Sequence, residues 1–189
     1  MKFDAIIVDA DICIKIGNSE KYRYLEKLFP IIADKVYIHT IVYNEILSPK
    51  CAKEQIDKLI SDGIAEVLDE SKLDDIEKLI YEATFLSLSS VMINPERPNK
   101  NRGEVASISM AKTKSIAYFA TDEKELQTII DEVLNTGMND LSCLRIVDII
   151  EMIRDGKLEG LKRKEAKVLW RLAGKSTESF DKNIWTIIE

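Results

Sequence analysis

The chain has 189 residues, of which 46% are hydrophobic and 32% are charged, and its formal net charge is −6. This length suits one domain with a real hydrophobic core, and the negative charge argues against a protein that coats nucleic acid through bulk electrostatics. An enzyme that holds cations in an acidic pocket remains open. Three scattered cysteines without C-x-x-C spacing, and no apolar run of membrane-span length, predict a cytoplasmic protein with no disulfide framework, no zinc site and no membrane partner.

The first predicted strand ends in two carboxylates. Ile6-Ile7-Val8 is a short β-branched run that reads as a buried strand, and Asp9 and Asp11 follow it directly. In open α/β sheets, ligands bind beyond the carboxyl ends of the strands. A carboxylate in that position needs compensation by a metal ion or a hydrogen-bond network. Asp9 is therefore the leading candidate for chemistry.

Strands and helices alternate along the rest of the chain. Further strands are expected at 36–38, 64–68, 116–120 and 144–147. Helices are expected at 12–16, 19–30, 41–47, about 56–60, 73–90, 104–112, 126–133, 149–153 and 161–172, and a polar tail follows. Ser19, Thr40 and the run Ser71-Lys72-Leu73-Asp74 have the chemistry of helix caps. This alternation predicts an α/β fold, three layers α/β/α around a mainly parallel central sheet.

Four acidic residues share one kind of position. Asp9 and Asp122 each follow a strand, Glu104 opens a helix after the loop 94–103, and Glu45 lies in the helix after the second strand. In a parallel sheet all four can converge at one edge. Clustered carboxylates repel one another unless they hold divalent cations, and two Mg²⁺ or Mn²⁺ ions about 4 Å apart are the usual apparatus of phosphodiester hydrolysis.

The sequence around these acids resembles the PIN-domain nucleases, metal-dependent ribonucleases that include the VapC-type toxins of toxin–antitoxin pairs. The resemblance rests on the segments 8–12 (VDADI), 44–47 (NEIL), 102–106 (RGEVA) and 120–124 (ATDEK), in that order. It implies a PIN-like fold, Mg²⁺ or Mn²⁺, an RNA substrate, and a metal-binding catalytic set of Asp9, Glu45, Glu104 and Asp122. Asp11, Thr121 and Glu123 would lie beside these ligands, although the family more often has a small polar residue or Asn at the position of Asp11.

The resemblance also bears on domains and partners. It covers about residues 1–150, so we expect a nuclease domain at 1–155 and a helical C-terminal extension at 156–189 packed on or beside it. An antitoxin protein and a second copy of the chain are the protein partners that such a family implies.

Basic residues supply candidates for nucleic-acid contact. Arg97, Lys100 and Arg102 lie on the loop before Glu104. The segment 157–175 holds seven basic and two acidic residues, and Lys164, Lys167 and Arg171 share one helical face. Both sets fit RNA phosphate, and both also fit an ordinary solvated surface.

Other functions compete with the nuclease. Asp9-Ala10-Asp11 fits the D-x-D of haloacid-dehalogenase-like phosphatases, with Asp9 as nucleophile and Asp11 as acid/base, although the expected Gly-Asp context is missing. A catalytically degenerate PIN module that binds RNA or serves as a scaffold is the third hypothesis. Asp122 could also be only a helix N-cap, and Glu104 could merely favour its helix dipole. The single histidine, His39, and the two tryptophans, Trp170 and Trp185, are expected to be structural.

Overall fold

The protein is built on one parallel sheet. The computed structural model describes residues 2–186. Its strands are β1 (Phe3–Val8), β2 (Ala33–His39), β3 (Ala65–Leu68), β4 (Tyr118–Ala120) and β5 (Ser142–Leu144). They lie in the order β3-β2-β1-β4-β5, and every neighbouring pair is parallel. β1 is therefore the central strand. The chain adds β2 and β3 on one side of β1 and then returns to add β4 and β5 on the other side. The carboxyl ends of β1 and β4 are therefore adjacent.

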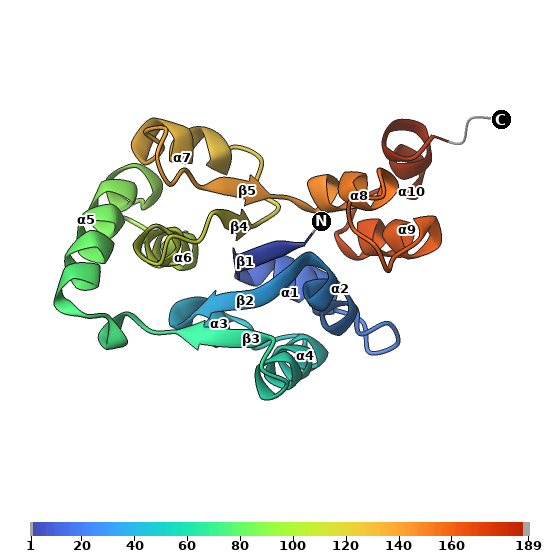
Figure 1. The fold of residues 1–189 in the computed structure, drawn as a ribbon, viewed down its shortest axis with the longest axis horizontal. Coiled ribbons are helices and arrows are strands. Elements are labelled where there is room, and N and C mark those ends of the chain that lie inside the picture. Colours follow the sequence, from blue (N-terminus) through green and yellow to red (C-terminus); the bar gives the residue numbers. More distant parts are fainter. Residues whose placement is uncertain (1, 187–189) are drawn as a thin grey trace.

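Helices connect the strands and cover both faces of the sheet. They are α1 (Ala10–Gly17), α2 (Tyr24–Ile32), α3 (Thr40–Glu45), α4 (Lys50–Ser61), the 3₁₀ turn η1 (Glu70–Lys72), α5 (Asp75–Met92), α6 (Arg102–Thr113), α7 (Leu126–Val133), α8 (Ile146–Arg154), α9 (Arg163–Leu172), α10 (Thr177–Ser179) and the π-helical turn η2 (Phe180–Ile184). Figure 1 shows α5 and α6 on one side of the sheet and α1, α2 and α9 on the other. The three-layer α/β fold predicted from the sequence is confirmed.

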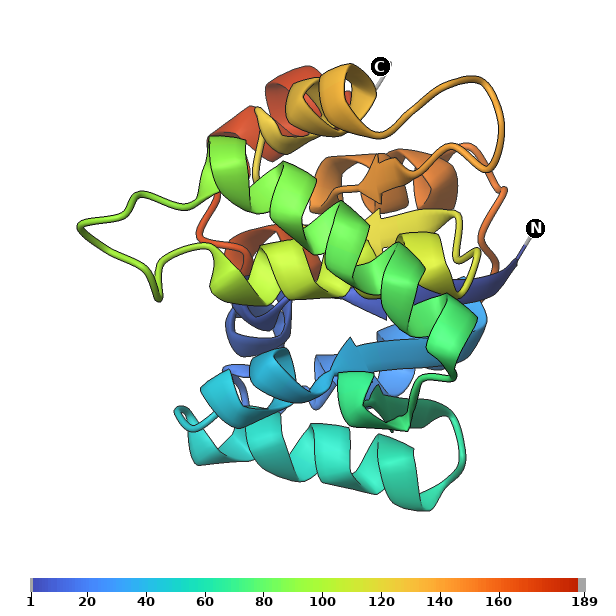
Figure 2. The same cartoon turned by 90° about the vertical axis from the view of Figure 1, so that its left-hand side faces the viewer.

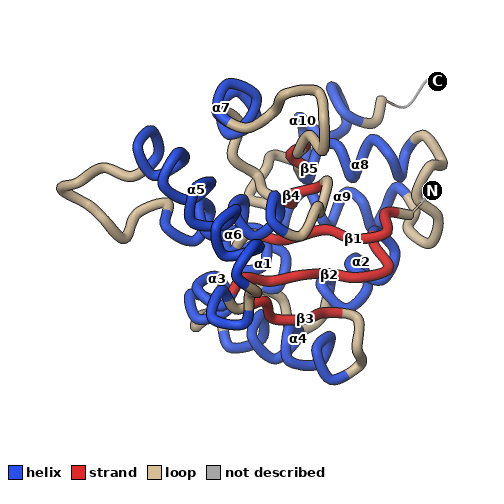
Figure 3. The backbone as a smooth tube through the Cα atoms, turned by 60° about the vertical axis from the view of Figure 1, so that its left-hand side comes forward, coloured by secondary structure: helices blue, strands red, loops and turns tan. Residues whose placement is uncertain are grey.

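Two hydrophobic cores fill the layers because side chains of β1 alternate between the two faces of the sheet. Ile6 and Val8 belong to the larger core with α1, α2, α4, α8 and α9, while Ile7 and Phe119 pack with α5, α6 and α7. All four side chains are fully buried. The continuous apolar run of β1 is thus explained by burial on both faces. Figure 3 shows β1 in the middle of the sheet, enclosed by helices.

The C-terminal helices share the larger core. Leu169, Trp170 and Phe180 belong to the same cluster as β1, and the hydroxyl of Tyr24 in α2 donates a hydrogen bond to the carbonyl of Glu165 at 3.0 Å. The expected packing role of Trp170 is confirmed, since it is only 7% exposed. The division of the chain at residue 155 stays a prediction. No helix in the described part of the chain is both long and apolar enough to cross a membrane.

The second helix begins and ends later than predicted. Ser19 caps a turn instead, in which its hydroxyl accepts the N–H of Tyr22 at 3.3 Å, and α2 starts only at residue 24. Pro30 does not stop the helix, which continues to Ile32. Phe29 and Ile32 are buried in the core, and their burial offsets the one backbone hydrogen bond that proline cannot donate.

The helix that carries Glu45 is capped by a different residue than expected. Thr40 is its first residue, and the threonine hydroxyl donates to the carbonyl of Leu68 at 2.9 Å. The cap is His39, whose Nδ1 accepts the N–H of Ile41 at 3.1 Å. The helix ends at Glu45, two residues before the predicted end, so this carboxylate lies at a helix terminus.

The predicted capping box at Ser71 is wrong in register. Residues 70–72 form the turn η1, and the box lies three residues later, where Asp74 accepts the N–H of Glu77 at 2.9 Å and Glu77 accepts that of Asp74 at 3.3 Å. Asp74, the last residue of the run predicted to form the box, is instead the N-cap residue that begins the long α5.

Two predictions near the C-terminus are also wrong. The last strand ends at Leu144 instead of beginning there, because the carboxylate of Asp148 accepts the N–H of Arg145 at 2.8 Å and starts α8. The expected polar tail is instead helical over 177–184 and is held by Phe180, which is fully buried against Trp170.

Candidate functional site

Asp9 sits at the end of the central strand and is almost fully buried. Its backbone N–H donates to the carbonyl of Ala120 at 3.0 Å, and its side chain is 3% exposed. Burial, together with the negative charges of Glu104 and Asp11, raises the pKa of Asp9 to about 7. The hydroxyl of Thr121 lies 3.4 Å from Asp9 Oδ2 and can donate to it. This carboxylate is therefore held in a place that disfavours its charge, which is the situation that a bound cation would relieve.

Glu104 lies in the first turn of α6 and faces the same region. Burial, followed by the charges of Glu123 and Asp11, raises the pKa of Glu104, while its own backbone N–H and Lys100 act in the opposite direction. Because α6 begins at Arg102, two residues earlier than predicted, Glu104 is the third residue of the helix rather than the first.

Glu45 reaches this region from α3 by lying over a glycine of α6. A Cβ atom on Gly103 would stand 2.8 Å from Glu45 Oε2 and 3.2 Å from Oε1, so the absent side chain leaves the space that the carboxylate fills. Burial of its carboxyl group and the charge of Glu104 raise the pKa of Glu45. Asp9, Glu45 and Glu104 are thus linked by repulsion, with Glu104 in the middle.

Asp122 differs from the other three acids because its neighbours are cations. Lys175 Nζ lies 3.0 Å from Asp122 Oδ1, and Lys15 Nζ lies 3.7 Å from Oδ2. The hydrogen bond with Asp148 raises the pKa of Arg145, and the charge of Asp122 adds to this. Asp122 is not the N-cap of α7, since that helix begins at Leu126.

The three residues expected beside the ligands do lie close to them. Asp11 and Glu123 raise the pKa of Glu104 through their charges, and the Thr121 hydroxyl also accepts the N–H of Glu123 at 3.3 Å. Asp11 forms an ion pair of 2.5 Å with Lys15, one helical turn along α1. Their roles stay predictions, but each now has a stated contact.

The donor set fits a divalent cation in chemistry and only in part in arrangement. Carboxylate oxygens are the ligands that Mg²⁺ and Mn²⁺ prefer. The pKa values of Asp9, Glu45 and Glu104 are raised by burial and by neighbouring negative charges, so a bound cation would stabilise their ionised forms. Within residues 2–186, however, no three His, Cys, Asp or Glu side chains stand together as a ready cage for one ion. Side-chain rotation toward a cation would be needed to form such a cage.

A cavity adjoins the acidic cluster. Its volume is about 260 Å³, and it lies between the end of α5 and the starts of α6 and α7. Glu104, Glu123 and Lys100 line it. Figure 2 shows the loop between α5 and α6, which carries Arg97 and Lys100, extending away from the body of the protein. Of the loop residues proposed to meet RNA, Lys100 is the one that the structure brings to the acids.

The other proposed RNA contacts lie elsewhere. Arg102 is exposed and lines a separate hollow with Tyr81, while Arg97 is exposed on the loop. Lys164 and Arg171 are exposed on α9, but Lys167 forms an ion pair with Asp181 that ties α9 to η2.

Comparison with known proteins gives a likeness among solved structures. No family model matches the chain, and no curated protein matches it. A chain in the crystal structure of VapBC2 from Rickettsia felis, bound to a DNA fragment from their promoter, is similar in structure: the TM-score is 0.45 and the identity 16%, over 75% of this chain and 98% of that chain. The fold itself is an α/β fold around a parallel sheet with the strand order β3-β2-β1-β4-β5. The PIN resemblance read from the sequence stays a prediction, and the likeness says nothing of activity.

The structure adds two site residues that the sequence reasoning did not select. Lys15 could have been found, because it lies four residues after Asp11 on α1, a spacing that pairs opposite charges. Lys175 gave no such signal, since it is 53 residues from Asp122 and belongs to a segment outside the family resemblance. His39, by contrast, is buried as expected and is hydrogen-bonded to Tyr81 at 3.2 Å, so it plays a structural part.

Proposed function

We propose that this protein is a divalent-metal-dependent ribonuclease that cleaves RNA phosphodiester bonds with Mg²⁺ or Mn²⁺. The observation that carries the proposal is the cluster of Asp9, Glu45 and Glu104 at the carboxyl edge of the parallel sheet, with the pKa of Asp9 raised to about 7. A protein keeps such repelling carboxyl groups together at a cost in stability, and a cation site is a function that accounts for that cost.

The residues divide the work by position. Asp9, directly after the central strand β1, would be the fixed ligand, with Thr121 orienting it. Glu45 and Glu104 would complete the ligand set from α3 and α6. Asp122 would join the set once its ion pairs with Lys15 and Lys175 are broken. A divalent cation bound there supplies Lewis-acid polarisation of the phosphate and an activated water. Lys100, which lines the adjoining cavity, would contact a phosphate of the substrate.

RNA cleavage with and without a chelator tests the proposal. The unaltered protein should cleave single-stranded RNA only with Mg²⁺ or Mn²⁺, and Asp9→Asn and Glu104→Gln should lose both the cleavage and the calorimetric binding of Mn²⁺. Asp34→Asn is a matched control, because Asp34 is an exposed acid at the start of β2, the opposite edge of the sheet from Asp9. Equal activity in Asp9→Asn and Asp34→Asn would refute the proposal.

A degenerate PIN module that binds RNA without cutting it is the second candidate. The pairing of Asp122 with Lys15 and Lys175 favours it, because a carboxylate already neutralised by two ammonium groups gains less from a metal ion. RNA binding that needs no divalent cation and leaves the RNA intact would decide for this candidate.

Partners and location follow from the same proposal. We propose a toxin role with an antitoxin partner, a homodimer as the assembled form, and a cytoplasmic location, which suits three free cysteines. A small reading frame beside the gene whose product binds this chain and suppresses its cleavage of RNA would support the toxin role. Sedimentation of the purified protein would establish whether it is a dimer.

A further inference from the structure

We propose that Lys175 competes with the divalent cation for Asp122, so that the C-terminal helices set the cation affinity of the site. The inference rests on the proposed cation site. Its starting point is the contrast among the acids: Asp9, Glu45 and Glu104 face negative charges, whereas each oxygen of Asp122 faces a lysine, at 3.0 Å for Lys175 and 3.7 Å for Lys15. The Asp122 side chain is 8% exposed and that of Lys175 is 23% exposed, so water screens this pair less than a surface pair.

The backbone holds Lys175 in this place. Helix α9 ends at Leu172, and Gly174 follows with a φ of +76°. In this turn the N–H of Gly174 donates to the carbonyl of Arg171 at 2.9 Å, and the N–H of Lys175 donates to that of Trp170 at 3.2 Å. After this turn, Trp170 Nε1 donates to the carbonyl of Ser176 at 2.8 Å. Lys175 therefore projects from a fixed corner between α9 and α10, and only its side chain has to move for Asp122 to change partners.

A cation cannot share Asp122 with Lys175 on equal terms. The ammonium group of Lys175 lies at hydrogen-bond distance from Asp122 Oδ1. A metal ion bound to the same oxygen would stand close to this ammonium group, and the two positive charges would repel each other. Binding the cation must then displace the lysine or forgo Asp122. By linkage, an interaction that stabilises the Lys175–Asp122 ion pair lowers the affinity of the site for the cation, and a bound cation destabilises that ion pair by the same free energy. The C-terminal helices thereby act on the site through one side chain.

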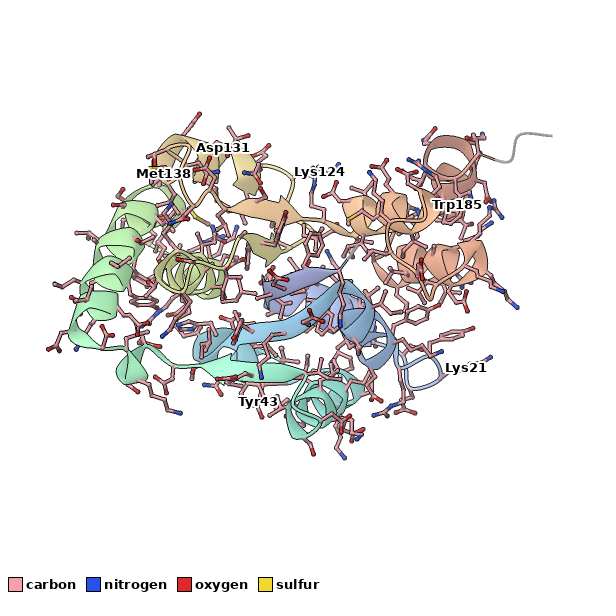
Figure 4. All side chains as sticks on the ribbon, in the orientation of Figure 1. Lys21, Tyr43, Lys124, Asp131, Met138 and Trp185 are labelled. Atoms are coloured by element: carbon pink, nitrogen blue, oxygen red, sulfur yellow. The ribbon has the colours of Figure 1, made fainter. Side chains whose placement is uncertain are left out.

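Tryptophan fluorescence can report the exchange directly. Lys175 Nζ lies 5.2 Å from the centre of the Trp170 ring, and both tryptophans of the chain are in this region. Figure 4 shows the second one, Trp185, beside the C-terminal helices on the far side of the molecule from α5. Withdrawal of the ammonium group from Asp122 changes the charge near the Trp170 ring, so its emission should change when diamagnetic Mg²⁺ binds.

The experiment compares four proteins: the unaltered chain, Lys175→Met, Lys175→Arg and Lys182→Met. Lys182 is the control, an exposed lysine of the same segment that pairs with Glu178 instead. Calorimetry with Mn²⁺ should show affinity raised about fivefold or more in Lys175→Met, and unchanged in Lys175→Arg and Lys182→Met. Mg²⁺ should change the tryptophan emission of the unaltered chain and of Lys182→Met, but not that of Lys175→Met.

The outcomes separate this inference from the proposed function. The competition would be overturned, and the cation site kept, by three results together. Asp9→Asn would abolish Mn²⁺ binding, Lys175→Met would bind Mn²⁺ with the affinity of the unaltered chain, and Mg²⁺ would leave the tryptophan emission of the unaltered chain unchanged. Mn²⁺ binding that is absent from the unaltered protein and from Lys175→Met alike would overturn both. A gain in affinity that Lys182→Met shares would mean that net charge acts, and it would overturn the specific role of Lys175.

Discussion

Gly103→Ala should lower RNA cleavage while leaving the fold as stable as before or more stable. The added Cβ would stand 2.8 Å from Glu45 Oε2, and ordinary contact begins at 3.4 Å, so the carboxylate must retreat by about 0.6 Å. That retreat is easy for the fold, because the clashing atom is the end of a flexible side chain. Gly103 has no positive φ, so alanine fits its backbone. Alanine should then stabilise α6 by up to about 1 kcal/mol.

The same displacement is costly for chemistry. Glu45 would be moved off the position from which it faces Glu104, and a misplacement of about 1 Å in a catalytic arrangement can cost about a hundredfold. We therefore expect kcat/KM for RNA cleavage to fall roughly tenfold to a hundredfold. Denaturant unfolding and Mn²⁺ calorimetry on the same preparation would show unchanged or increased stability and weakened cation binding.

A double variant shows whether the effect passes through Glu45. In a Glu45→Ala background the carboxylate is gone, so Gly103→Ala should have no further effect on cleavage. If Gly103→Ala lowers kcat/KM by the same factor with and without Glu45, the reasoning from the Gly103 contact is wrong. A loss of stability beyond 1 kcal/mol in the single variant would be equally damaging, because it would mean that the backbone, not the carboxylate, has moved.

Three more predictions follow from the site. Because the folded-state pKa of Asp9, about 7, is above the unfolded value of 3.8, the folded protein binds more protons between these pH values. Without metal the free energy of unfolding should fall by a few kcal/mol from pH 4 to pH 8, and Asp9→Asn should flatten that slope in urea titrations. Asp11→Asn should keep most metal-dependent cleavage, whereas an aryl phosphatase activity that this change destroys would make the nuclease assignment wrong. Changing Lys164, Lys167 and Arg171 together to Gln should weaken RNA binding and flatten its salt dependence, and unaltered binding at low salt would leave α9 an ordinary surface.

The sheet could be predicted because its strands carry strong local signals. The run Ile6-Ile7-Val8 is apolar on both faces, and alternation with helical periodicity leaves a parallel sheet as the simple solution. Helix ends were harder to predict. Pro30 and Ser71 have the right local chemistry for a stop and a cap, yet burial of Phe29 and Ile32 and the competing Asp74 box decided the outcome. Local helix preferences are worth about 1 kcal/mol, and core packing that contributes several kcal/mol overrides them.

The acids could be selected from the sequence because strand ends and helix starts are places where a fold displays side chains. Asp9, Glu45 and Glu104 were found in this way, and their pKa values show that they influence one another. Their surroundings could not be predicted. The space above Gly103 depends on how α3 crosses α6, and the contact of Lys175 depends on where the C-terminal helices dock. Both are long-range facts that no local pattern contains.

The position of Asp122 changes what the ordered set of four acids means. In the sequence, Asp122 is equivalent to Asp9, since each follows a strand of the same sheet. In the structure, Asp9 is buried and faces the carboxylates of Glu104 and Asp11. Asp122 instead faces Lys15 and Lys175. A cation would relieve repulsion at Asp9 and would have to break attraction at Asp122. The two residues should therefore respond differently to substitution: Asp9→Asn removes the ligand that most needs a metal ion, and Asp122→Asn removes a ligand that the chain already neutralises itself.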